Sequence, residues 1–74
     1  MNSKISILTS KEVIRALTKL KFIKISQKGS HAKFKNLETN RICIVPMHYE
    51  IAKGTLTSIL EQANIELEDF LNQL

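Results

Sequence analysis

The 74-residue sequence contains one cysteine, one proline, two glycines and no tryptophan. The single cysteine, Cys43, cannot form a disulfide within the chain, which favours a reducing compartment. With so little glycine and proline there is no visible linker or repeat, so we expect one small domain over residues 1–74. No apolar run is long enough for a membrane span or a signal peptide. We therefore expect a cytoplasmic protein with no membrane partner.

Acidic side chains are nearly absent from the first half of the chain. Up to Lys35 the sequence has nine lysines and arginines and one acid, Glu12. From Asn36 onward it has two basic residues and six acids. The basic half is a candidate surface for a polyanion. The alternative is that these lysines only solvate a small protein, and charge alone leaves both interpretations open.

Hydrophobic periodicity predicts a helix near the start of the chain. Thr9, followed three residues later by Glu12, forms a capping box with Thr9 as the N-cap. Apolar residues then recur at helical spacing, which predicts an amphipathic helix from about Ser10 to Lys19 or Leu20.

Two further helices are predicted in the second half. The stretch GTLTSILEQAN indicates a helix capped by Thr55, with Asn64 as a left-handed C-cap. The stretch IELEDFLNQL indicates a short acidic helix. Three apolar residues would anchor this last helix: Leu67, Phe70 and Leu71.

Between the helices, the stretches FIKISQ, SHAKFK and RICIV read as strands. A two-residue turn at Lys28 and Gly29 would join the first two, and Pro46 would end the third. This register pairs Ile25 with Ala32 and Ile23 with Phe34 on an apolar face, and Ser26 with His31 and Lys24 with Lys33 on a polar face. Ile42 and Ile44 would continue the apolar face, with Cys43 near the open one. The expected architecture is α+β: helix, three-stranded antiparallel sheet, helix and short C-terminal helix, with one sheet face open.

His31 is the main candidate for chemistry. A lone histidine more often packs in a core, but alternation places His31 beside Lys33 and Lys35 on the polar face. RNA carries its own nucleophile, the 2′-OH, so a protein can cleave it by accepting that proton and stabilising charge on the phosphate. His31 could be the base, with Lys24 and Lys33 near the phosphate. Six residues are candidate RNA contacts: Lys24, Lys28, Ser30, Lys33, Lys35 and Lys53.

The sequence gives little support for a metal or cofactor. Cys43 and His48 lie on either side of a proline turn without a second ligand pair, which is weak for zinc. There is no glycine-rich phosphate loop. Without a paired base, Cys43 is interpreted as a small strand residue rather than a nucleophile. We expect neither metal nor cofactor.

Four motifs, SKEVIRALTKLKF, GSHAKF, VPMH and GTLTSILEQANIELEDF, carry a family resemblance. In order and spacing, from about Leu8 to Leu71, the chain resembles the HicA mRNA-interferase toxins of HicA–HicB toxin–antitoxin systems. The resemblance implies a fold similar to double-stranded-RNA-binding domains and a ribosome-independent endoribonuclease whose essential histidine is His31. It also implies a HicB antitoxin partner that blocks the active site, with DNA bound only through the complex.

Three positions depart from the family pattern. The family usually has glycine where this chain has Lys21, and an Arg-Gln pair where it has Ser26 and Gln27. The loop after His48 is also slightly short. His48 matches the Val-Pro-x-His motif, for which both loop capping and catalysis remain open.

Two functions from different classes follow. The preferred one is a metal-independent toxin endoribonuclease acting on mRNA through His31, and the alternative is a non-catalytic RNA-binding module.

Overall fold

A computed structural model of the chain describes residues 7–74. In chain order the elements are α1 (Ser10–Lys19), β1 (Phe22–Lys28), β2 (His31–Asn36), β3 (Ile42–Pro46), α2 (Lys53–Ala63) and α3 (Leu67–Leu71). Residues 1–6 lie outside the described residues. They include Lys4 of the basic half. The expectation that the N-terminal stretch is not a signal peptide also falls partly on these residues.

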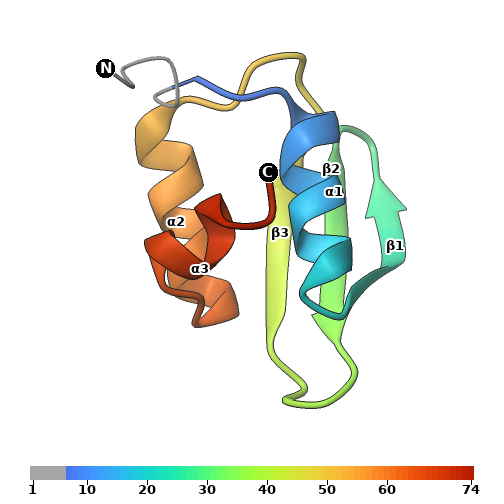
Figure 1. Ribbon diagram of the computed structural model, residues 1–74. Helices are drawn as coiled ribbons and strands as arrows, with labels where there is room; N and C mark the ends of the chain where they lie inside the picture. Colours follow the sequence, from blue (N-terminus) through green and yellow to red (C-terminus); the bar gives the residue numbers. More distant parts are fainter. Residues whose placement is uncertain (1–6) are drawn as a thin grey trace.

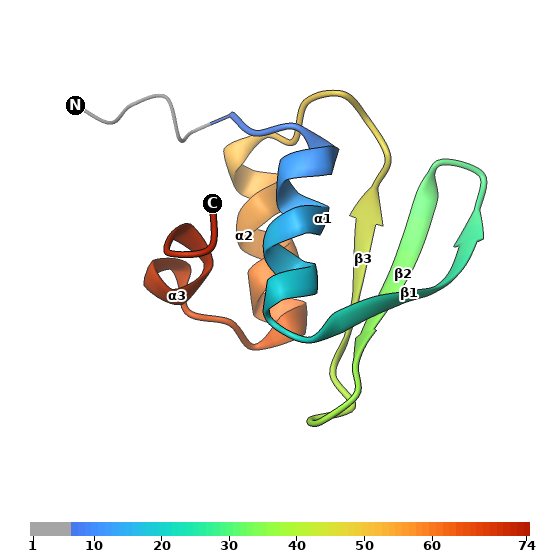
Figure 2. The ribbon, with the colours of Figure 1, turned by 45° about the vertical axis from the view of Figure 1, so that its right-hand side comes forward.

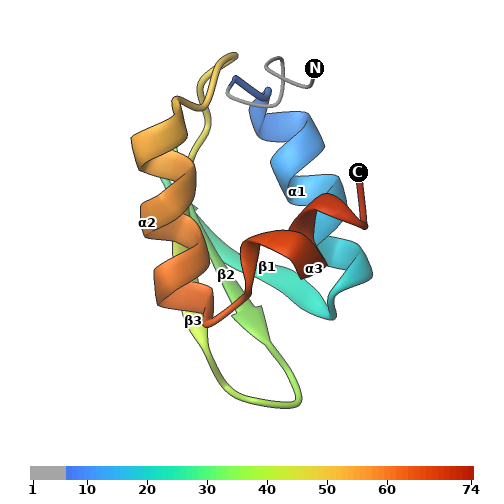
Figure 3. The same ribbon diagram turned by 60° about the vertical axis from the view of Figure 1, so that its left-hand side comes forward.

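The three strands form one antiparallel sheet in the order β1-β2-β3, and the helices cover one of its faces (Figures 1 and 2). In Figure 3, α3 lies between α1 and α2 on the side away from the sheet. The core between the layers contains the rings of Phe22 and Phe70 and the side chain of Leu17, all fully buried. This order confirms the expected α+β architecture and is compatible with a double-stranded-RNA-binding-domain-like fold.

The capping box at the start of α1 is confirmed. The Thr9 hydroxyl accepts a hydrogen bond from the Glu12 backbone N–H at 3.1 Å, and the Glu12 carboxylate accepts one from the Thr9 backbone N–H at 2.9 Å. Both donors would otherwise be unsatisfied in the first turn. α1 therefore begins where the local sequence predicts.

The start of α2 differs from the prediction. Its N-cap is Ala52, whose side chain cannot cap, and Thr55 lies inside the first turn, so the prediction of a Thr55 cap is wrong. The preceding residue, Ile51, pairs with Leu8 in an isolated bridge and is buried, so tertiary pairing fixes where the chain turns into the helix. Asn64, with φ 58° and ψ 46°, is the left-handed C-cap that was predicted.

The anchoring of α3 is confirmed in part. Phe70 is fully buried and Leu71 is half-buried against the core, but Leu67 is 53% exposed. A five-residue helix has few positions on any one face, and Leu67 occupies its first position. The prediction that Leu67 anchors the helix is therefore wrong.

The register of the first hairpin also differs from the prediction. The turn is Gly29–Ser30, with Gly29 at φ +59°, so that Lys28 pairs with His31. Ser26 consequently pairs with Lys33 and keeps the predicted face. A β-bulge between Lys24 and Ser26 then shifts the register by one residue.

On the N-terminal side of that bulge, the β1 side chains lie on the faces opposite to those predicted. Lys24 pairs with Phe34, on the face that the helices cover, and Ile23 pairs with Lys35 on the open face, where it is 44% exposed. A one-residue shift moves every following side chain to the opposite face. The predicted pairs Lys24–Lys33 and Ile23–Phe34 are therefore wrong.

The faces of β3 are likewise opposite to the prediction. Cys43 and Val45 are fully buried beneath the helices, while Ile42 is 43% exposed and Ile44 is half-buried. Residues 42–45 are all apolar, so either alternate set of side chains could face the core. The sequence pattern of this strand therefore could not assign its faces.

Lys21, which joins α1 to β1, has a backbone φ of +77°. This left-handed conformation costs an L-residue about 1–2 kcal/mol, whereas glycine adopts it freely. It explains why the family pattern has glycine here. We predict that Lys21→Gly raises the free energy of unfolding by about 0.5–1 kcal/mol, measured by urea or thermal unfolding.

Arg15→Gly is the control, because it removes another long, exposed cationic side chain from within α1. It should lower stability by about 0.5–1 kcal/mol. If Lys21→Gly lowered stability by a similar amount, the left-handed conformation would impose no strain.

Candidate functional site

The open face of the sheet consists of three rows of cross-strand neighbours. These rows are Lys28–His31–Pro46, Ser26–Lys33–Ile44 and Ile23–Lys35–Ile42. All three contain side chains from β2, the central strand. No helix covers this face in the described part of the chain (Figure 2).

His31 lies at one end of the open face. It is the first residue of β2 and is exposed, with Lys28 beside it on one strand and Pro46 on the other. The Met47 backbone N–H donates to the Ser30 carbonyl at 2.6 Å, which holds the chain on either side of this end together. The His31 side chain is exposed, and its imidazole makes no hydrogen bond to another residue among residues 7–74.

The other candidate RNA contacts do not all lie with His31. Lys28 and Lys33 belong to the first two rows of the open face, and Lys35 is half-buried in the third. Ser30 is exposed in the turn next to His31. The structure therefore places these four candidates on the open face or beside it.

Lys24 does not share that face, contrary to the prediction. It pairs with Phe34, and its ammonium group donates to the Gln27 side-chain oxygen at 2.7 Å. Lys53 is the first residue of α2 and is exposed. The start of α2 lies at the same end of the molecule as the β1–β2 turn (Figure 1).

The far half of the open face is apolar as well as basic. Ile23 and Ile42 flank Lys35 there and are 44% and 43% exposed. Ile25, at the bulge, is also 44% exposed. Alternation in the sequence predicts all three isoleucines on the apolar face of the sheet, so this exposed apolar area is not predicted by the sequence.

Cys43 is not a nucleophile in this fold. It lies on the covered face of β3, fully buried, and burial raises the pKa of its thiol from 9.0 to about 11. The thiol is thus protonated at neutral pH, whereas thiolate is the reactive form. No group of three metal-binding side chains occurs among the described residues.

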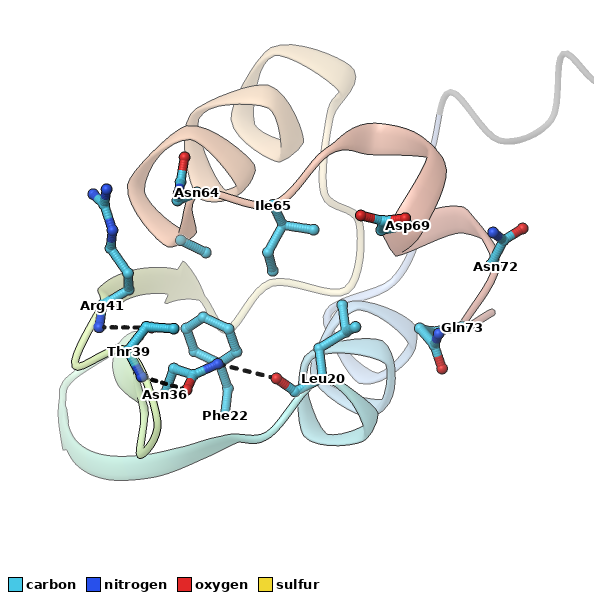
Figure 4. A pocket seen from close by; sticks show the side chains of 11 residues that line it. Leu20, Phe22, Asn36, Thr39, Arg41, Asn64, Ile65, Asp69, Asn72 and Gln73 are labelled. Atoms are coloured by element: carbon cyan, nitrogen blue, oxygen red, sulfur yellow. Dashed lines mark hydrogen bonds between the residues drawn. The ribbon is translucent and has the colours of Figure 1, made fainter.

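A pocket of about 320 Å³ lies at the other end of the sheet (Figure 4). Leu20, Phe22 and Ile65 line it, and Arg41 and Asp69 stand on opposite sides. Figure 4 also shows the Asn36 side chain beneath it.

The Asn36 amide serves the fold rather than a ligand. It donates to the Leu20 carbonyl at 3.1 Å and accepts from the backbone N–H groups of Glu38 and Thr39. Because His31 and Asn36 are the two ends of β2, this pocket is separate from the His31 site.

The loop between β3 and α2, which begins after Pro46, the β3 partner of His31, contains two exposed rings. His48 is exposed, and its imidazole makes no hydrogen bond to another residue of the described range, so the loop-capping alternative finds no support there. Tyr49, which is 80% exposed, was missed by the sequence reasoning. The available signal was a lone aromatic residue within a polar loop.

Residues 10–65 match the family model described as the HicA toxin of bacterial toxin–antitoxin systems. No curated protein matches the sequence. None of the helices in the described range is long and apolar enough to cross a membrane.

Proposed function

Since the chain belongs to the HicA toxin family of bacterial toxin–antitoxin systems, we propose that it is an mRNA endoribonuclease in which His31 is the general acid–base group. The observation that carries this proposal is the position of His31. Its imidazole is exposed and unpartnered within the described range, with Lys28 and Lys33 on the same face. An exposed imidazole beside ammonium groups can supply the proton transfer and the positive charge used in RNA cleavage through the 2′-OH.

The chemistry follows from the substrate. His31 accepts the proton of the ribose 2′-OH, and the resulting oxygen attacks the adjacent phosphorus in line with the leaving 5′-oxygen. The P–O5′ bond breaks and leaves a 2′,3′-cyclic phosphate, the departing 5′-oxygen takes a proton from water to become a 5′-hydroxyl, and His31 releases its proton to solvent. The nucleophile belongs to the RNA, so the protein supplies proton transfer, orientation and positive charge.

The lysines have different parts in this proposal. Lys28 lies in the same row as His31 and Lys33 lies in the next row, and both hold the phosphate whose charge increases in the transition state. Lys53 and the turn residue Ser30 bind the RNA backbone next to the scissile phosphate. Lys35 extends the RNA-binding surface along β2. Lys24 is exposed but pairs with Phe34 on the opposite face of the sheet from His31, so it does not lie beside the scissile phosphate in this proposal.

The family implies an antitoxin partner, and we propose that it is of the HicB type and covers the open face. That face offers basic groups near His31 and exposed isoleucines at the other end. DNA contact would then belong to the complex, and the toxin would act on mRNA in the cytoplasm.

Incubating the purified chain with single-stranded RNA in EDTA tests the proposed function. We expect cleavage to persist, because the 2′-OH is the nucleophile, and the products to carry 2′,3′-cyclic phosphate and 5′-hydroxyl ends. DNA of the same sequence should remain intact, since it lacks that hydroxyl.

Lys33→Ala and Lys24→Ala provide a comparison within the same assay. With the observed register, Lys33→Ala should raise KM more than Lys24→Ala. RNA binding without cleavage would identify a binding module instead, and cleavage of DNA would contradict the 2′-OH mechanism.

A further inference from the structure

Tyr49 has no packing role in the fold. It lies between β3 and α2 and is 80% exposed, more than any other large apolar or aromatic side chain described. Its neighbours His48 and Glu50 are exposed polar residues. The ring gains nothing from the core, and both of its faces can be reached by a ligand at this exposure.

The loop limits how far the Tyr49 backbone can lie from the His31 end of β2. Met47, two residues earlier, is hydrogen-bonded to Ser30, the residue before His31. Two peptide links separate the Met47 and Tyr49 Cα atoms by at most about 7 Å. On the C-terminal side of Tyr49, the buried Ile51 pairs with Leu8, which fixes the position of the chain two residues after the tyrosine.

The chemistry around the ring favours a nucleobase over a protein side chain. A protein contact usually needs a contiguous apolar patch, and the exposed isoleucines Ile23 and Ile42 lie in the row of Lys35, about 13 Å along β2 from His31. Tyr49 is surrounded by polar groups instead. A single aromatic ring beside a basic surface is the arrangement on which single-stranded RNA bases stack.

We infer that Tyr49 stacks on a base of the RNA strand bound at His31 and thereby helps to position the strand for cleavage. This inference rests on the proposed function. Every base has a π-face, so the stacking would select single-stranded over paired RNA more than one base over another. Tyr49 is a substrate-binding residue in this account and takes no part in proton transfer.

The composition of the chain supplies a direct probe. Tyr49 is the only tyrosine, and there is no tryptophan, so intrinsic fluorescence reports on this ring alone. The His31→Ala variant should hold a short single-stranded RNA without cutting it. Titration with that RNA should quench the tyrosine emission in a saturable manner, whereas a fully paired duplex should quench it less.

Variants provide the second measurement. Tyr49→Ala should bind the same RNA about tenfold more weakly, and Tyr49→Phe should retain most of the affinity because its ring still stacks. In the cleavage assay Tyr49→Ala should raise KM about tenfold with little change in kcat. Leu37→Ala is the matched control, because Leu37 is 63% exposed but follows the far end of β2.

The possible failures can be told apart. If wild-type protein cleaves RNA while Tyr49→Ala has the same KM and RNA causes no quenching, the stacking inference is wrong and the proposed function stands. If quenching occurs only with an antitoxin protein, Tyr49 is a partner contact and the inference is again wrong. Absence of any RNA cleavage by the wild-type chain overturns the proposed function itself.

Discussion

Replacing His31 with alanine is expected to lower the rate of RNA cleavage by about 10²–10⁴-fold, the usual contribution of a positioned acid–base group. The imidazole is exposed at the start of β2, with no hydrogen-bond partner in the described range to assist or replace it. Lys28 and Lys33 remain in the variant, so RNA should still bind. The loss should therefore appear in kcat, measured by single-turnover cleavage of a labelled RNA.

The same variant should keep its fold. His31 contributes nothing to the buried core, and exposed substitutions usually change stability by no more than about 0.5 kcal/mol. His48→Ala is the matched control, because it removes another exposed imidazole from the neighbouring loop. Loss of the cooperative unfolding transition in His31→Ala would show that the histidine is structural, and an equal loss of activity in His48→Ala would show that His31 is not the sole acid–base group.

Features determined by neighbouring residues were predictable from the sequence. The capping box of Thr9 and Glu12 and the left-handed Asn64 depend on side chains or backbone conformations within a few residues. The order of helices and strands follows from hydrophobic periodicity over similarly short stretches. His31 could be placed on the open face because polar and apolar residues alternate cleanly in β2.

Features determined by pairing were not predictable in the same way. The bulge before Ser26 has no proline or glycine to mark it, yet it moves Lys24 to the covered face. In β3 the apolar residues run consecutively, so only pairing with β2 decides that Cys43 is buried and Ile42 is exposed. The predicted placement of His31 and Lys33 on one face is therefore confirmed, and the predicted placement of Lys24 on that face is wrong.

The corrected open face changes what an antitoxin must contain. Acidic side chains suit Lys28 and Lys33 at the His31 end, but Ile23 and Ile42 at the other end call for apolar contacts. Charge complementarity mainly sets the rate of encounter, and burial of apolar surface helps to hold the complex together. A wholly electrostatic inhibitor would leave the isoleucine end exposed.

We therefore predict that a HicB-type antitoxin stops cleavage and protects the backbone amides of residues 23–35 from hydrogen exchange. Its association rate should fall steeply with added salt, within the 10–10³-fold range typical of electrostatic steering, while its dissociation rate changes less. Stopped-flow binding at several salt concentrations measures both rates.

Two lysine-to-glutamate variants, which change the net charge equally, test whether the antitoxin contacts the open face. Lys33→Glu, on the open face, should slow association and weaken its salt dependence, because it removes an attraction that steers the acidic partner. Lys11→Glu, on the exposed surface of α1, should have a much smaller effect, since this residue belongs to the layer on the other side of the sheet. Equal effects of the two variants, or protection confined to α3, would mean that the antitoxin inhibits without covering His31.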